Sequence, residues 1–120
     1  MIKEKTKKLI NSFKYAFSGI ITSFKTERNM KIHTLITVLV IIMGILLKIS
    51  KTEWIICIFA ISMVISAELF NTAIETIVDM ITTEKNEKAR IAKDISAGAV
   101  LMTAMGAAIV GLIIFIPKLI

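Results

Sequence analysis

Three long apolar segments are separated by short charged ones, and a fourth segment at the N-terminus has a different pattern. The apolar segments cover residues 34–50, 54–81 and 95–116. A helix needs about 20 residues, within a range near 17–25, to cross the hydrocarbon core of a bilayer. The second and third segments meet that length, and the first needs a few flanking residues. The pattern therefore predicts transmembrane helices at about residues 31–50, 53–81 and 93–117.

The N-terminal segment carries an apolar side chain at every third or fourth position. These positions are Leu9, Ile10, Phe13, Phe17, Ile20, Ile21 and Phe24. Lysines and hydroxyl residues lie between them, so a helix here would have one apolar and one polar face. Lysine and phenylalanine in this arrangement suit the plane of the membrane interface. We expect an amphipathic surface helix over about residues 5–28, ahead of the three membrane helices.

The composition agrees with an all-α integral membrane protein. Hydrophobic residues make up 56% of 120 residues, whereas soluble chains average about 45–50% apolar residues with glycine included. A soluble domain of this length could not bury so much apolar surface. The length leaves room for one domain. The single cysteine, Cys57, lies within an apolar segment and excludes an intrachain disulfide.

The net charge of +6 comes from bases that flank the apolar segments. They do not alternate with aromatic residues, which argues against a nucleic-acid partner and for a role in membrane topology. Residues 1–33 carry eight bases and residues 82–94 carry four, whereas the turn at 48–53 carries two. The positive-inside rule predicts a multi-pass protein of the cytoplasmic membrane, with a cytoplasmic N-terminus and the C-terminus outside.

Polar residues interrupt the second apolar segment. Glu68, Asn71, Glu75 and Asp79 are spaced by three, four and four residues, so they share one helix face. A carboxylate near the middle of a membrane is costly and is by default a functional hypothesis. The alternative is a helix that is already leaving the membrane, which suits Asp79 better than Glu68.

The chemistry that suits this acidic face is phosphoryl transfer to a lipid hydroxyl. Glu68, deep in the membrane, can take a proton from a hydroxyl. Glu75 lies about 10 Å further along the helix axis, where a divalent cation could be held by carboxylates and substrate phosphates. The chain has no GxxxxGK[ST] phosphate loop, so a nucleotide needs another binding site. The flanking segments 26–33 and 84–100 are the candidates.

Three motifs together resemble the prokaryotic diacylglycerol kinase family of small membrane lipid kinases. They are "ERN-x-x-IH" at 27–33, "E-x-x-NTAIE-x-x-VD" at 68–79 and "AKD-x-x-AGAVL" at 92–101. The resemblance covers nearly the whole chain and implies a single membrane lipid kinase domain over residues 1–120. It further implies a homotrimer whose subunits each have a surface helix and three membrane helices, with ATP as donor and Mg²⁺ as cofactor.

The resemblance also implies a role for each matching residue. Glu68 would be the general base beside Asn71, and Glu27 and Glu75 would bind the nucleotide-associated Mg²⁺. The nucleotide contacts would come from Lys8, Tyr15, Glu27, Glu75, Glu84, Lys85, Asn86, Lys93 and Asp94. The lipid alcohol would lie near Glu68, Ser12 and Ala97. Taken alone, Lys93 fits better as a topology-setting base, and Asp94 fits better as a helix N-cap.

Departures from the family pattern bear on the acceptor lipid. Enterobacterial members have an aromatic residue and a histidine where this chain has Lys85 and Asn86, and an acid where it has His33. The ERN-x-x-IH motif is more similar to the Gram-positive branch, whose members favour undecaprenol. We therefore expect an undecaprenol kinase, with diacylglycerol kinase as the alternative. We interpret His33 as an interfacial residue that ends a loop, rather than as a pH sensor.

Two other classes of membrane protein share some of these sequence features. A small proton-coupled transporter also uses an intramembrane glutamate, but three spans with acids at one membrane edge disfavour an inverted-repeat design. A structural or pore-forming membrane peptide would explain the hydropathy and charge. It would leave the face with Glu68, Asn71 and Glu75 without a purpose.

Overall fold

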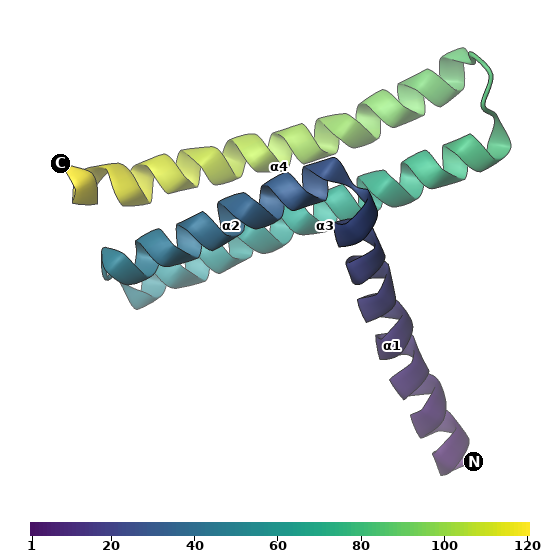
Figure 1. Cartoon of the computed structure of the whole chain (residues 1–120), viewed down its shortest axis with the longest axis horizontal. Helices are drawn as coiled ribbons and strands as arrows, with labels where there is room; N and C mark the ends of the chain where they lie inside the picture. The colour runs from purple at the N-terminus through teal and green to yellow at the C-terminus, as the bar shows by residue number, and fades with distance from the viewer.

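The computed structural model describes all 120 residues and contains four helices and no strand. The helices are α1 (Ile2–Thr26), α2 (Arg28–Leu46), α3 (Lys51–Ile81) and α4 (Glu87–Leu119). Helices α2, α3 and α4 lie side by side, and α1 leaves them at a steep angle (Figure 1). Since α2, α3 and α4 are each long and apolar enough to cross a membrane, the prediction of an all-helical chain with three membrane-length helices is confirmed.

The turns between the first three helices have local causes. Glu27 alone separates α1 from α2, and its backbone is extended, with φ −103° and ψ 120°. Helix α2 therefore begins at Arg28. It ends at Leu46, shortly before Lys48, whose backbone is left-handed with a φ of 50°. At the next helix, Ser50 and Glu53 form a capping box, each side chain accepting a hydrogen bond from the other's backbone N–H.

The start of α4 differs from the sequence-based interpretation. Asn86 is its N-cap, and Asn86 Oδ1 accepts a hydrogen bond of 3.1 Å from the backbone N–H of Ala89. The helix thus begins at Glu87, well before residue 93, and Asp94 lies inside it. The interpretation of Asp94 as an N-cap is wrong because the Asn86 amide already performs that role.

A small apolar core holds the α2–α3 turn, α3 and α4 together at the end of the bundle remote from the α3–α4 loop. Its buried members are Ile49, Cys57, Ile114 and Phe115. Trp54 packs against this cluster and against Gly44 of α2, where an added Cβ would lie 2.7 Å from Trp54 Cη2. Nearby, Lys118 Nζ lies 3.1 Å from Glu53 Oε1 and joins the two helix ends.

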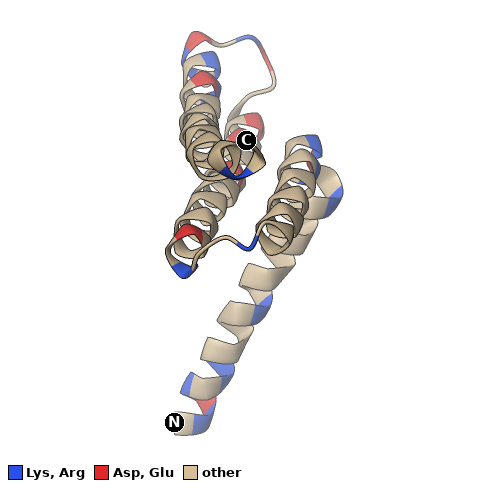
Figure 2. Cartoon of the chain, turned by 90° about the vertical axis from the view of Figure 1, so that its left-hand side faces the viewer, with Lys and Arg blue, Asp and Glu red and all other residues tan.

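Most of the apolar surface remains uncovered. Only 11 of the 120 residues are buried, and large side chains such as Phe59 and Phe70 are 70% exposed. Charged residues gather along α1 and near the helix ends, while the middles of α2, α3 and α4 are largely uncharged (Figure 2). Apolar surface of this extent requires lipid or other protein chains around the helices.

Candidate functional site

Glu68 is the most buried charged residue of the chain, with only 2% of its surface exposed. It lies on α3 and faces His33 of α2, whose Nε2 is 3.6 Å from Glu68 Oε2. That separation is too long for a hydrogen bond, and Glu68 Oε2 has no hydrogen-bond partner. The interpretation of His33 as the end of a loop is wrong, because α2 begins at Arg28 and His33 lies within it.

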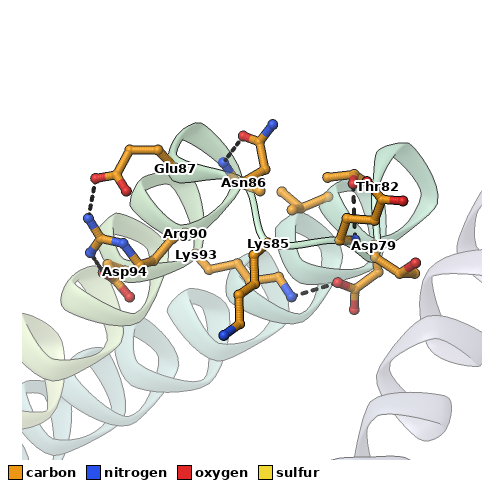
Figure 3. A pocket seen from close by; sticks show the side chains of 12 residues that line it. Asp79, Thr82, Lys85, Asn86, Glu87, Arg90, Lys93 and Asp94 are labelled. Atoms are coloured by element: carbon orange, nitrogen blue, oxygen red, sulfur yellow. Dashed lines mark hydrogen bonds and ion pairs between the residues drawn. The ribbon is translucent and has the colours of Figure 1, made fainter.

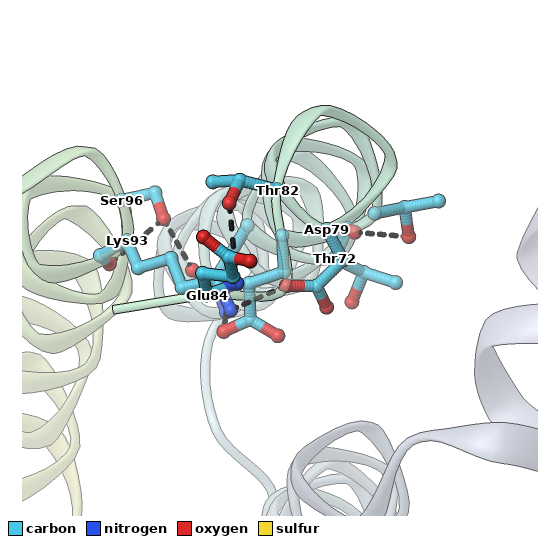
Figure 4. A network of polar contacts seen from close by, with 9 residues as sticks. Thr72, Asp79, Thr82, Glu84, Lys93 and Ser96 are labelled. Carbon is cyan, nitrogen blue, oxygen red and sulfur yellow. Dashed lines mark hydrogen bonds and ion pairs between the residues drawn. The ribbon is translucent and has the colours of Figure 1, made fainter. Parts of the chain in front are cut away.

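A buried hydrogen-bond network continues along the same face of α3. Ser96 of α4 donates a hydrogen bond of 2.6 Å to Asn71 Oδ1, and Asn71 Nδ2 donates one of 3.2 Å to Glu75 Oε1. Figure 4 shows this network reaching from α4 to α3. Ser96 was not among the expected site residues, although a hydroxyl residue between Lys93 and an apolar run is a signal that could have identified it.

A cavity of about 290 Å³ opens beside Glu68 between α2, α3 and α4. Its lining includes three residues that the sequence analysis assigned to catalysis or to the lipid substrate, namely Glu68, Asn71 and Ala97. Apolar side chains complete its wall, among them Ile32 and Leu101. The cavity thus combines one buried carboxylate with a largely apolar wall.

A second cavity, of about 550 Å³, lies beside the α3–α4 loop, and most of the residues that line it are polar or charged (Figure 3). It brings together five of the expected nucleotide-binding residues: Glu84, Lys85, Asn86, Lys93 and Asp94. Lys93 Nζ lies 2.6 Å from Asp79 Oδ1, and both side chains are about half exposed. Asp94 pairs with Arg90 at 3.0 Å, a partner that the sequence analysis did not identify.

A third cavity, of about 640 Å³, lies between α1 and α3. Tyr15 and Glu27 line it, together with Ser23 and Thr72. The hydroxyl groups of Ser23 and Thr72 are buried there without a hydrogen-bond partner.

Three expected site residues, Lys8, Ser12 and Glu75, line none of these cavities, and Glu75 is instead joined to the site by its hydrogen bond from Asn71. Lys8 and Ser12 are exposed on the outer turns of α1, where the Ser12 hydroxyl donates a hydrogen bond of 3.0 Å to the Lys8 carbonyl. Within one chain, α1 points its first half away from the bundle (Figure 1).

The acidic groups of the site offer the oxygen ligands that a magnesium ion prefers. No group of three or more His, Cys, Asp or Glu side chains forms a metal site by itself. Glu75 Oε1 accepts a hydrogen bond of 3.2 Å from Asn71 Nδ2, and the Glu27 carboxylate makes no capping bond to α2. Mg²⁺ is commonly held by one or two carboxylates, with substrate phosphates and water completing the shell. The two carboxylates fit that donor set.

The fold and the site define a helical membrane protein with an acidic site between its helices. The model of the prokaryotic diacylglycerol kinase family matches residues 14–115, and the chain belongs to that family. It is 43% identical over 112 residues to the undecaprenol kinase of Bacillus subtilis, covering 93% of this chain and 91% of that one. It is also 40% identical to the diacylglycerol kinase of Synechocystis sp., covering 92% of this chain and 64% of that one. The diacylglycerol kinase of Haemophilus influenzae is 35% identical, with 78% of this chain and 80% of that one covered.

Proposed function

We propose that the protein is an ATP- and Mg²⁺-dependent lipid kinase that phosphorylates the hydroxyl group of undecaprenol at the cytoplasmic face of the membrane. The observation that carries the proposal is the burial of Glu68 beside a mostly apolar cavity between three membrane-length helices. A carboxylate in such a place suits a reaction whose acceptor comes from the bilayer. The similarity to an undecaprenol kinase over nearly the full length of both chains supports the same acceptor.

In the proposed reaction, Glu68 acts as the general base. The hydroxyl oxygen of the lipid forms a bond to the γ-phosphorus of ATP, and its proton moves to the Glu68 carboxylate. The bond between the γ-phosphorus and the β–γ bridging oxygen breaks, and ADP leaves. Most of the rate enhancement would come from positioning and charge neutralisation. Asn71, held by Ser96 and bonded to Glu75, would keep the polar wall of the cavity fixed.

The nucleotide would bind at the polar end of the bundle. Lys93 would exchange its ion pair with Asp79 for a phosphate group, since a lysine ammonium is a compact charge that binds phosphate well. Contacts to the rest of the nucleotide would come from Lys8, Tyr15, Glu84, Lys85, Asn86 and Asp94. Mg²⁺ held by Glu27 and Glu75 would neutralise phosphate charge when bound.

The proposed setting is a homotrimer in the cytoplasmic membrane. Helix α1 would lie on the cytoplasmic surface as an amphipathic helix, with the N-terminus inside and the C-terminus outside. The uncovered apolar faces of α2, α3 and α4 support packing against further subunits and lipid. Lys8 and Ser12, remote from the cavities within one chain, would then meet ligand across a subunit boundary.

Diacylglycerol is the alternative acceptor, since the chain is 40% identical to a diacylglycerol kinase. Purified protein in lipid vesicles would be given γ-labelled ATP with undecaprenol or diacylglycerol in parallel. We expect faster labelling of undecaprenol. Faster labelling of diacylglycerol would instead identify diacylglycerol as the acceptor. Proton flux across the vesicle without transfer of label to either alcohol would instead identify a transporter.

A substitution of the proposed base tests the mechanism. Glu68→Gln should lower turnover by about 10²-fold or more while nucleotide affinity stays near that of the unaltered protein. Glu4→Gln, on the exposed first turn of α1, is the matched control. Substantial residual turnover in Glu68→Gln would remove Glu68 from the base role.

A further inference from the structure

His33 occupies a distinct position in the site. It is the only histidine of the chain, and its side chain is 16% exposed. It lines both the 290 Å³ cavity beside Glu68 and an apolar cavity of about 260 Å³ that extends along α2, α3 and α4 to Phe115. The imidazole therefore lies where the polar and apolar parts of the site meet.

The two oxygens of the Glu68 carboxylate have different surroundings. Oε2 is buried and has no hydrogen-bond partner, whereas Oε1 is not one of the fully buried, unpaired oxygens. The other charged groups that act on Glu68 are Glu27, at the start of α2, and Glu75, on α3 itself. Both are acids and repel the carboxylate, whereas α4 directs its Ser96 hydroxyl at Asn71 instead. The His33 imidazole is the one basic side chain within 4 Å of Oε2.

We propose that His33 is a positioning residue for Glu68, with its Nε2–H donating a hydrogen bond to Glu68 Oε2 and thereby directing Oε1 toward the acceptor hydroxyl. This inference rests on the proposed role of Glu68 as the base. The present distance of 3.6 Å needs a shift of only a few tenths of an ångström to reach hydrogen-bond range. Hydrogen bonds of this kind are often long without substrate and shorten in the complex.

The first test compares turnover with substrate affinity in two variants of His33. His33→Phe keeps a ring but removes the donor, while His33→Gln keeps an N–H that can reach the carboxylate. We expect His33→Phe to lower kcat by about tenfold or more, with the KM for ATP changed by less than about threefold. His33→Gln should recover most of the lost kcat.

Ile36→Phe is the control for the first test, because it adds a phenyl ring to α2 beside the same apolar cavity. A loss in Ile36→Phe equal to that in His33→Phe would assign the effect to ring size and overturn the proposal. The proposal would also fall if His33→Phe kept the kcat of the unaltered protein, or if His33→Gln were no better than His33→Phe.

The second test needs no substrate and no activity. The protein with ¹⁵N-labelled histidine in detergent micelles gives the nitrogen signals of a single imidazole, since the chain has one histidine. We expect the Nε2 signal to move when Glu68 is changed to Gln, and to stay in place in Glu4→Gln. An unmoved Nε2 signal in Glu68→Gln would refute the pairing. Lack of transfer to any lipid alcohol would refute the proposed function alone and leave this measurement intact.

Discussion

The Ser96 hydroxyl of α4 donates a hydrogen bond of 2.6 Å to Asn71 Oδ1 of α3, and both side chains are buried. Because the amide oxygen accepts from Ser96, the amide nitrogen points toward Glu75 and bonds its Oε1 at 3.2 Å. The orientation of Asn71 is thus set by a neighbouring helix. The polar groups of α3 form a connected network, which is more rigid than separate polar residues.

Removing the Ser96 hydroxyl should free the Asn71 amide to rotate. We expect Ser96→Ala to lower kcat several-fold, because Glu75 loses its fixed hydrogen-bond donor, while stability falls by about 1 kcal/mol or less. Steady-state kinetics in vesicles and unfolding in detergent measure the two effects. Ser66→Ala, at an exposed position of α3, is the control. Equal kinetics in the two variants would mean that the network does not matter for turnover.

Glu75 is expected to govern the magnesium requirement. Glu75→Gln removes one of two carboxylates proposed for the ion, so the half-saturating Mg²⁺ concentration should rise by about tenfold. Glu27→Gln should act in the same direction, whereas Glu4→Gln should not. The measurement is a Mg²⁺ titration of turnover at saturating ATP, after chelation of the purified protein. An unchanged Mg²⁺ titration in Glu75→Gln and Glu27→Gln would exclude both residues as ligands.

Substitutions of Lys93 and Asp79 should differ in their effect on the KM for ATP, although the two side chains form an ion pair. Lys93→Met is expected to raise the KM for ATP by about tenfold, because a phosphate loses its counter-charge. Asp79→Asn should change that KM by less than about threefold, since both side chains are solvent-exposed and such pairs contribute little stability.

The control for this pair is Lys88→Met, which removes an exposed base from the first turns of α4. A KM increase in Lys88→Met as large as in Lys93→Met would point to general electrostatic attraction of ATP. A large increase in Asp79→Asn would give Asp79 a direct role in nucleotide binding.

The membrane helices were predictable because hydropathy over about 20 residues is a strong, local signal. The face shared by Glu68, Asn71 and Glu75 followed from helical spacing alone. Contacts between helices were not predictable in this way. Ser96 meets Asn71 from a different helix, and a helix–helix register depends on packing along the whole interface rather than on any local motif.

Helix ends were predicted less well, for a physical reason. Asp94 and Asn86 are both good N-cap residues, so the preference of single residues does not predict at which of the two positions α4 begins. The structure uses Asn86, with an Oδ1 bond to Ala89, so a further segment of helix carries Arg90 and Lys93. His33 similarly belongs to α2 because Glu27 alone interrupts the helical backbone.

The packing of Gly44 against Trp54 should limit what residue 44 can be. A Cβ at this position would lie 2.7 Å from Trp54 Cη2 and 2.9 Å from Trp54 Cζ2. Gly44→Ala should therefore destabilise the protein in detergent by about 1–3 kcal/mol, the usual range for overpacking. Gly106→Ala is the control, because no atom lies within 4 Å of its added Cβ. Trp54→Phe removes the clashing ring atoms, so the double variant Gly44→Ala/Trp54→Phe should lose less stability than the two single losses added together. Additive losses, or a Gly44→Ala variant as stable as Gly106→Ala, would contradict this close packing of α2 on α3.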